Sequence, residues 1–166
     1  MSALILAQQL STLLSNTFVF SQQLHSFHWL LRGRGFNSMH PFLGEDYSNV
    51  YESVDTYAEQ VLTLEYEPPV QLSEYLALST SIREIPRISD YEKILHIAYS
   101  SHQIIGNLIK EVYKTAEECN AFDISNYLGE RQGYHFKKAW FYRAELGIPV
   151  PSIFEASKTP LQTNPT

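Results

Sequence analysis

The sequence predicts an all-α protein, a four-helix bundle with a short extra helix in its middle connection. Apolar residues recur at helical steps of three and four along most of the chain, and no long stretch alternates as a strand does. Breaks rich in glycine, proline or asparagine separate four long segments and a short one. With 166 residues, of which 44% are hydrophobic, the chain is long enough to bury one sizeable core.

The first two helices are predicted by an apolar face followed by clear stop signals. The first helix is expected to end near Leu31, at the glycines of R-G-R-G. Asn37 or Ser38 is expected to cap the second helix, with Pro41 in or near its first turn, where proline is tolerated. This helix should run to about Tyr66, before a double proline.

The second half of the chain is expected to supply the short helix and two more long ones. A short helix or turn is predicted over residues 72–79. Ser89 followed by Glu92 is a capping-box pattern that opens a third long helix through roughly Glu118. The fourth helix should run to about Leu146, where G-I-P-V-P ends it.

One domain is expected over residues 1–150, with a C-terminal tail over residues 151–166. A chain with a single cysteine, Cys119, can form neither an internal disulfide nor a cysteine-based metal cluster. This favours a reducing cytoplasm. The uncharged N-terminus lacks the basic region of a signal peptide, and polar residues interrupt it too often for a membrane span. We therefore expect no membrane association.

The charge distribution indicates which partners to expect. The formal net charge is -6, and residues 35–82 contain many Asp and Glu but no Lys or Arg. An acidic middle segment favours cations as partners and disfavours binding to the phosphates of DNA. Glu45, Asp46 and Glu52 are candidates for an acidic inner surface.

Two pairs of residues have the chemistry of metal ligands. His28 and His40 flank the break between the first two helices, and Asp55 and Glu59 stand four residues apart on one face of the second helix. The alternatives are ordinary hydrogen-bonded histidines and a solvated acidic face. Nitrogen with carboxylate ligation suits iron(II), manganese or zinc better than calcium or magnesium.

Distance constrains how these pairs can act together. Fifteen residues of one helix separate His40 from Asp55, which corresponds to about 22 Å. One ion cannot bridge that distance within a chain. Either the pairs are unrelated, or a second copy of the chain supplies the acids to the histidines across a two-fold interface.

These residues resemble the motifs of the Dps, or mini-ferritin, family of ferritin-like proteins. The pattern is H-W-x3-G-x2-F-x3-H followed by D-x2-A-E, and the resemblance extends in weaker form over most of the chain. It is made here by His28, Trp29, Gly33, Phe36, His40, Asp55, Ala58 and Glu59.

The resemblance implies a hollow dodecamer of ferritin-like four-helix bundles with ferroxidase sites at its two-fold interfaces. In that arrangement His28 and His40 come from one subunit, and Asp55 and Glu59 from its partner. Iron(II) would bind there and be oxidised by hydrogen peroxide or oxygen. The iron(III) would be stored inside as a mineral, which protects against peroxide.

The chain departs from the family pattern at two places. Gly44 stands where the family usually has Asp or Glu, so one carboxylate is missing, and Glu45 is a candidate metal ligand only if the helix is distorted. The alternative is a shell-forming or partner-binding protein with a degraded ferroxidase site. Many family members bind DNA through lysine-rich tails, but the N-terminus here has no charged side chain.

Overall fold

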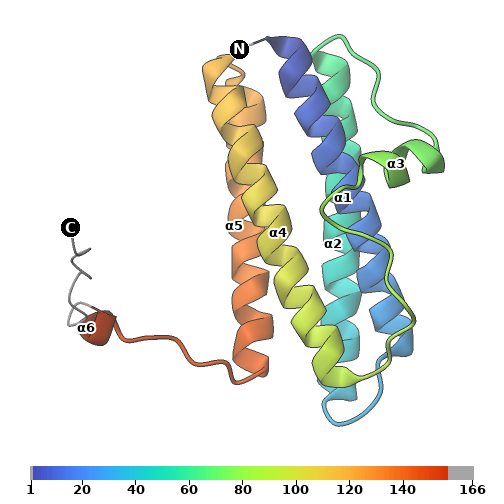
Figure 1. Ribbon diagram of the computed structural model, residues 1–166, viewed down its shortest axis with the longest axis vertical. Coiled ribbons are helices and arrows are strands. Elements are labelled where there is room, and N and C mark those ends of the chain that lie inside the picture. Colours follow the sequence, from blue (N-terminus) through green and yellow to red (C-terminus); the bar gives the residue numbers. More distant parts are fainter. Residues whose placement is uncertain (1, 157–166) are drawn as a thin grey trace, which may run out of the picture.

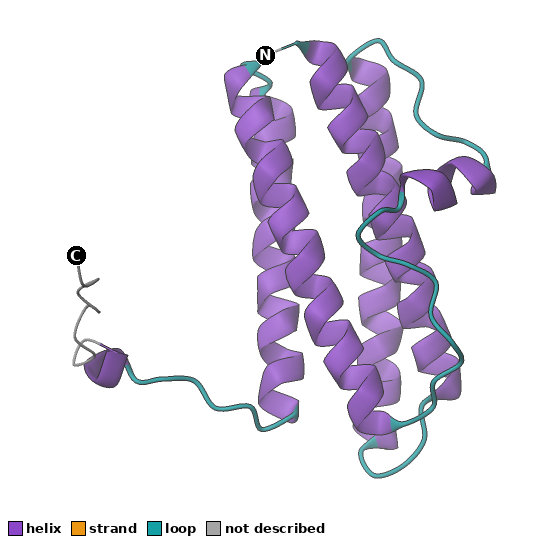
Figure 2. Ribbon diagram, viewed as in Figure 1, coloured by secondary structure: helices purple, strands orange, loops and turns teal. Residues whose placement is uncertain are grey.

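The computed structural model describes residues 2–156, in which every regular element is a helix (Figure 2). A single isolated bridge, between Arg32 and Asp90, lies outside the helices. The elements are α1 (Ala3–Leu30), α2 (Phe36–Thr63), α3 (Leu72–Leu78), α4 (Tyr91–Glu118), α5 (Phe122–Glu145) and α6 (Ile153–Ala156).

The four long helices form two antiparallel hairpins that pack side by side (Figure 1). Short turns join α1 to α2 and α4 to α5, while the crossover over residues 64–90 runs the length of the bundle and contains α3. The long crossover makes α2 and α4 run in the same direction (Figure 1). This confirms the predicted four-helix bundle with a short helix in its middle connection.

The core lies along the inner faces of the four helices. Its largest fully buried side chains include Tyr57, Tyr142, Phe20 and Phe27. By length and composition α1 alone among the described helices is apolar enough to cross a membrane, but 56% of its most apolar stretch is buried in the bundle. Packing in the core therefore accounts for the apolar composition of α1.

The turn before α2 differs from the prediction. The helix begins one residue after Gly35, which has a φ of 88° and no side chain to act as a cap, so a cap at Asn37 or Ser38 is wrong. The ring of Tyr91 packs against Gly35, and a Cβ there would lie 2.6 Å from the Tyr91 hydroxyl oxygen. Both the left-handed conformation and this close contact require glycine.

Two other helix ends also lie a few residues from their predicted positions. Asp90 rather than Ser89 caps α4, since its side chain accepts a hydrogen bond of 2.9 Å from the backbone N–H of Lys93. The second helix ends at Thr63 instead of near Tyr66. The short helix α3 lies where it was predicted.

Two buried side chains of α1, Asn16 and Gln23, hold the crossover by hydrogen bonds to its backbone. Asn16 is fully buried, and its Oδ1 accepts hydrogen bonds from the backbone N–H groups of Ser81 (2.9 Å) and Ile82 (2.8 Å). The hydroxyl oxygen of Ser79 lies 3.3 Å from the same Oδ1, and its hydroxyl donates a hydrogen bond of 2.6 Å to the backbone oxygen of Ile82. An irregular segment is thereby held against a helix without leaving its backbone donors unpaired.

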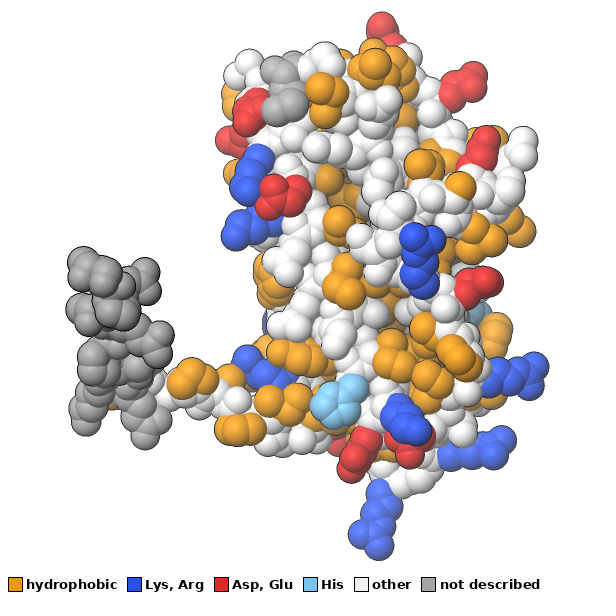
Figure 3. Space-filling model, in the orientation of Figure 1, with side chains coloured by type: hydrophobic (Ala, Val, Ile, Leu, Met, Phe, Trp, Pro, Cys, Tyr) orange, Lys and Arg blue, Asp and Glu red, His pale blue; other side chains and the backbone are white. Residues whose placement is uncertain are grey.

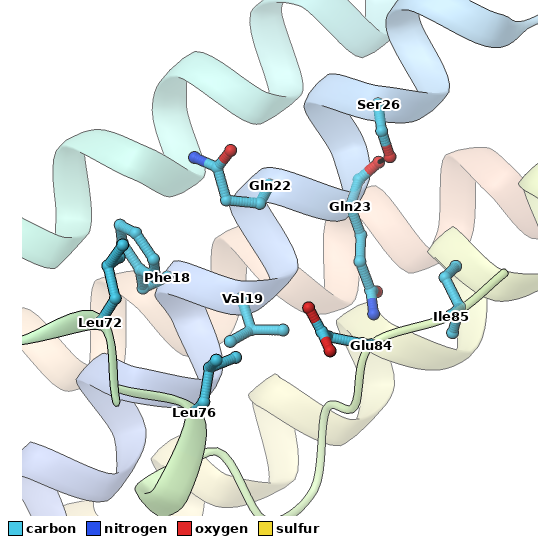
Figure 4. A pocket seen from close by; sticks show the side chains of 9 residues that line it. All are labelled: Phe18, Val19, Gln22, Gln23, Ser26, Leu72, Leu76, Glu84 and Ile85. Carbon is cyan, nitrogen blue, oxygen red and sulfur yellow. Dashed lines mark hydrogen bonds between the residues drawn. The ribbon is translucent and has the colours of Figure 1, made fainter. Parts of the chain in front are cut away.

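A hollow of about 340 Å³ lies between α1, α3 and the crossover (Figure 4). Phe18 and Val19 of α1 face Leu72 and Leu76 of α3 across it. Glu84 is the one carboxylate in its lining, which contains no histidine or cysteine. This hollow therefore lacks the side chains of a metal site.

Candidate metal centre

The turn between α1 and α2 brings His28 and His40 face to face. Their imidazole rings stack with centroids 3.8 Å apart and an interplanar angle of 20°. The Nδ1 atom of His28 lies 2.7 Å from the backbone oxygen of His40, and Nδ1 of His40 lies 2.9 Å from the backbone oxygen of His28. The structure thus confirms that these two side chains, twelve residues apart, approach each other.

These reciprocal hydrogen bonds determine which nitrogen of each ring can bind a ligand. A carbonyl oxygen only accepts, so Nδ1 must carry the hydrogen in both His28 and His40. In the neutral ring Nε2 then has a free lone pair, the form in which imidazole binds metals. The backbone carbonyls play the orienting part that second-shell groups play in metal sites. Two oriented imidazole donors are therefore available within one protomer.

Aromatic side chains surround the pair. Phe36 stacks on His40 with centroids 4.9 Å apart, and the edge of Tyr47 meets His28 at 5.5 Å. Trp29 is 65% exposed on the same turn of α1. In the protomer this end of the two helices presents an exposed aromatic surface beside two nitrogen donors.

His25 is a third histidine in this region, and the sequence analysis missed it. Its ring stacks on Tyr47 with centroids 3.9 Å apart and lies 6.3 Å from the ring of His28. Burial, followed by repulsion from His28, lowers the pKa of His25 below its usual value. The three-residue spacing from His28 is the signal that predicts a shared helix face.

The backbone of Gly44 packs against the imidazole ring of His28. A Cβ at position 44 would come within 3.3 Å of Cε1 and 3.4 Å of Nδ1 of the imidazole. Any side chain there would therefore require the ring to shift by a few tenths of an ångström. Glycine at this position both removes a carboxylate and leaves room for the stacked histidine pair.

Glu45, the proposed substitute for that carboxylate, is exposed on the next position of α2. Its charge contributes to raising the pKa of Tyr134 on α5, after the larger effects of burial and of Asp46. Among the described contacts, none joins Glu45 to His28 or His40. The distortion that would turn it toward them is also absent from α2, which is a continuous helix.

Asp55 and Glu59 are exposed on α2, one helical turn apart. Neither carboxylate makes a hydrogen bond or ion pair within the described residues. Asp55 lines a surface hollow of about 560 Å³ together with Tyr51, Ala58 and Tyr75. The carboxylates are therefore available to a partner in solution or in an assembly.

The structure brings each predicted pair together but keeps the two pairs apart. Because α2 is continuous from Phe36 to Thr63, the separation of about 22 Å between His40 and Asp55 holds. The described part of the chain contains no group of three or more His, Cys, Asp or Glu residues that could hold a metal ion. A complete site would need donors from two copies.

A separate polar cluster occupies the middle of the bundle. Asp46 is fully buried, so its prediction as part of an acidic surface is wrong. Its Oδ2 lies 2.9 Å from Nε2 of His102 and accepts a hydrogen bond of 2.6 Å from Tyr142, while Oδ1 accepts one of 2.7 Å from Tyr134. The chain of contacts continues from Nδ1 of His102 to Nδ1 of His135, at 2.9 Å.

The ionisation of this cluster follows from its contacts. Burial alone would raise the pKa of Asp46, but the charge and hydrogen bond of His102, with Lys138 and Tyr142, lower it far below its usual value. Burial, then repulsion from His102 and Arg131, lowers the pKa of His135 well below its usual value. We conclude that a carboxylate is held ionised inside the bundle beside a neutral histidine.

The spacing of core residues could have predicted this cluster. Asp46 lies three residues after Leu43 and four before Val50, both of which are fully buried. His102 likewise lies three residues before the buried Ile105. Polar residues in the middle of an apolar helical stripe are expected to be buried and hydrogen-bonded.

Comparison with known proteins shows which protein family the chain belongs to. A family model of the ferritin-like domain matches residues 7–148, so the chain belongs to the ferritin-like family. Within that family its relatives in both sequence and structure include Dps proteins, as the motifs indicated.

Two relatives illustrate the similarity in sequence. Antigen TpF1 of Treponema pallidum is 38% identical over 111 residues, which span 61% of this chain and 63% of that protein. The DNA protection during starvation protein of Helicobacter pylori is 27% identical over 138 residues, 82% of this chain and 95% of the relative.

The solved structures agree with this assignment. The crystal structure of TpF1 superposes with a TM-score of 0.83 at 25% identity, covering 87% of this chain and 92% of that one. The Dps protein of Vibrio cholerae gives a TM-score of 0.82 at 24% identity, covering 87% and 90%. That protein is described as a member of a broad superfamily of ferritin-like diiron-carboxylate proteins.

Proposed function

We propose that this protein is a Dps-like mini-ferritin that binds and oxidises iron(II) at sites shared by two subunits and stores the iron(III). The observation that carries the proposal is the His28–His40 pair, whose reciprocal Nδ1–carbonyl contacts leave both Nε2 atoms free as ligands. Asp55 and Glu59 of a second copy would complete the site and balance the charge of the ion. A dodecamer built on such pairs, in the cytoplasm, fits the family.

The substrate chemistry requires an electron acceptor, which is hydrogen peroxide or oxygen. With peroxide, two iron(II) ions each lose one electron, the O–O bond accepts both electrons, and two protons complete two waters. His28 and His40 would hold iron in place through fixed rings, because the backbone carbonyls prevent their rotation. Trp29 and Phe36, which are exposed in the protomer, would form an apolar wall that limits water at the site.

Iron(II) oxidation tests this function. The double variant His28→Ala/His40→Ala, mixed anaerobically with iron(II) and then hydrogen peroxide, should oxidise iron no faster than a protein-free control. His96→Ala is the matched control, because His96 is exposed on α4, outside this cluster, and should leave the rate unchanged. A wild-type protein that oxidises iron(II) only at the protein-free rate would refute the proposal.

Gly44 supports a second candidate, a shell-forming or partner-binding protein with a degraded ferroxidase site. Gly44→Asp would restore a carboxylate but also crowd His28, so Gly44→Ala is needed to measure the crowding alone. If Gly44→Asp oxidises iron(II) at least tenfold faster than wild type, the native site is degraded. Equal rates would favour an active native site.

Binding to DNA is not part of the proposed function. On the face seen in Figure 3, basic side chains gather toward one end of the bundle, but acidic side chains lie among them. The chain carries a formal net charge of -6, and an assembly would multiply it. A gel-shift assay at low salt should therefore show no DNA complex, because binding to DNA depends on neutralising its phosphates.

A further inference from the structure

The buried carboxylate of Asp46 accepts hydrogen bonds from two phenols that the proposed iron chemistry does not use. Tyr142 donates one of 2.6 Å to Oδ2, and Tyr134 donates one of 2.7 Å to Oδ1. Asp46 and Tyr142 are fully buried. Although burial opposes it, the charge and hydrogen bond of His102 hold the pKa of Asp46 far below its usual value. Each phenol therefore already contacts an ionised proton acceptor.

A phenol in this arrangement can lose an electron without creating a cation in the core. A phenol that has lost an electron is a much stronger acid than a carboxylic acid. Its proton therefore passes to the oxygen that already accepts its hydrogen bond. The products are a neutral phenoxyl radical and a neutral carboxylic acid, whereas a radical cation would carry the cost of a buried, unpaired charge.

The two phenols differ in the charges around their rings. The guanidinium carbon of Arg131 lies 4.4 Å from the centroid of the Tyr134 ring, and Nζ of Lys138 lies 5.7 Å from it. A cation over an aromatic ring is attracted to the ring's electrons and therefore opposes their removal. Among the described cation–ring contacts, none involves Tyr142. Tyr142 is therefore the better electron donor of the two.

Ring contacts connect Tyr142 to the surface of the protomer. Its ring meets the ring of Phe42 with centroids 5.3 Å apart, and Phe42 meets Phe141 at 5.9 Å. Phe141 stacks on Trp140 at 4.8 Å. Trp140 is 51% exposed. Rings packed this closely allow an electron to tunnel from the buried phenol to the exposed indole, so an oxidant outside the bundle can draw on Tyr142.

We propose that Tyr142 is a redox-active residue that reduces hydroxyl radicals through Trp140. The radical takes one electron from the indole of Trp140 and becomes hydroxide. Tyr142 returns an electron to the indole, and its phenolic proton moves to Oδ2 of Asp46. In total, a phenol, a carboxylate and a hydroxyl radical give a phenoxyl radical, a carboxylic acid and hydroxide. Hydroxyl radicals form when a single iron(II) ion reduces peroxide, so this activity goes beyond the proposed iron oxidation and does not require it.

Flash oxidation of the iron-free protein tests the inference. The full-length protein would be mixed with photogenerated tris(bipyridine)ruthenium(III), a one-electron oxidant too large to enter the bundle, and frozen for EPR. We expect a persistent tyrosyl radical with a hydrogen bond from an exchangeable proton, identified by comparing water with heavy water. Tyr142→Phe, which keeps a ring in the core, should lose this signal and leave a tryptophanyl radical. Tyr113→Phe is the matched control, because Tyr113 is 38% exposed on α4, and it should keep the signal.

Two further variants test the electron path and the proton acceptor. Trp140→Phe should slow the formation of the buried radical but leave its hydrogen-bond signature unchanged. Asp46→Asn should abolish the persistent radical, because an amide oxygen is a much weaker base than a carboxylate. If Asp46→Asn does not fold, Tyr142→Phe alone decides the question.

The outcomes separate this inference from the proposed function. A persistent tyrosyl signal in Tyr142→Phe equal to that of wild type would overturn the inference, and so would the absence of such a signal in wild type. Because no iron is present, the result does not depend on iron(II) oxidation. A wild-type protein that forms the radical but oxidises iron(II) only at the protein-free rate would keep this inference and refute the proposed function.

Discussion

At the scale of single residues, the candidate site depends on how two imidazoles are held. His28 and His40 stack on each other and each contacts the other's backbone carbonyl, which selects the tautomer with Nε2 free to bind a ligand. Gly44 contributes because it has no side chain, since a Cβ there would press on the ring of His28. Small changes beside the rings should therefore alter metal affinity without altering the fold.

Gly44→Ala tests this directly. The added Cβ would approach Cε1 of His28 to 3.3 Å and should displace the ring, while alanine favours the helix itself. We expect Co²⁺ affinity to fall by a few-fold, equivalent to roughly 1 kcal/mol, with the thermal midpoint unchanged or raised. Gly133→Ala is the control, because a Cβ at Gly133 meets no atom within 4 Å. Unchanged cobalt affinity in Gly44→Ala would mean that the exact position of His28 does not matter.

Asp46 is predicted to be a strong determinant of stability. Its carboxylate accepts hydrogen bonds from Tyr134 and Tyr142 and contacts His102, all in the bundle interior. Asp46→Asn preserves size but replaces an acceptor with a donor, which should cost about 2–4 kcal/mol of unfolding free energy. The same change at the exposed Asp55 should cost less than about 0.5 kcal/mol. Denaturant unfolding of the metal-free protein at one fixed concentration measures both, and equal losses would contradict the account.

His135 should make the protein sensitive to acid. Its pKa is lowered by burial and by His102 and Arg131, so below about pH 6.5 the unfolded chain binds a proton that the folded chain does not. The contribution of His135 to the free energy of unfolding is therefore present above about pH 6.5. It is lost as the pH falls below that value, by up to about 1.4 kcal/mol per pH unit.

Unfolding between pH 7 and 5 checks this prediction. His135→Gln should have a shallower pH dependence than wild type, whereas His96→Gln, at an exposed position, should not. Identical slopes for wild type and His135→Gln would show that His135 takes up a proton equally in both states.

At the scale of elements, α2 is the central component of the site. It is one continuous helix from Phe36 to Thr63, with His40 near its start and the Asp55 and Glu59 carboxylates well beyond its middle. A continuous helix keeps the two residue pairs of one chain apart, so in the proposed site a second chain would supply the other pair. The crossover matters as well, because Tyr75 of α3 lines the hollow beside Asp55.

Asn16 should control how firmly the crossover is held. Asn16→Ala leaves the backbone N–H groups of Ser81 and Ile82 without their acceptor, and the loss at the buried Ile82 should cost about 1–3 kcal/mol of unfolding free energy. Hydrogen exchange should show faster exchange at these two amides. Asn107→Ala, at an exposed position of α4, is the control. Unaltered protection of Ser81 and Ile82 would mean that other contacts hold the crossover.

At the scale of the whole molecule, the sequence predicted the architecture because periodicity reports packing directly. The four long helices and α3 follow from apolar spacing and from breaks. Helix ends were less predictable: Gly35 ends the turn before α2 in a left-handed conformation against Tyr91, a contact with a residue far along the chain. Such tertiary contacts have no local signature.

The candidate site was also predictable from the sequence only in part. The approach of His28 to His40 was predictable from the short break between two helices, and the shared face of Asp55 and Glu59 from their spacing of four residues. Their role as metal ligands stays a proposal. Asp46 was misassigned because it follows Glu45 in an acidic stretch, and only its alignment with Leu43 and Val50 indicates burial. The position of His25 was missed because its ring contact with Tyr47 of the next helix has no local signature in the sequence.

The central claim is that each site takes histidines from one subunit and carboxylates from another. Subunits with His28→Ala/His40→Ala and subunits with Asp55→Ala/Glu59→Ala would be coexpressed with different tags, and the mixed assemblies purified through both. In a two-fold pair of unlike subunits, one site loses all four ligands and the other retains all four. Each parent alone should bind and oxidise essentially no iron(II), whereas random equal mixing should recover about one quarter of the wild-type sites. Mixed assemblies as inactive as their parents would contradict a shared site.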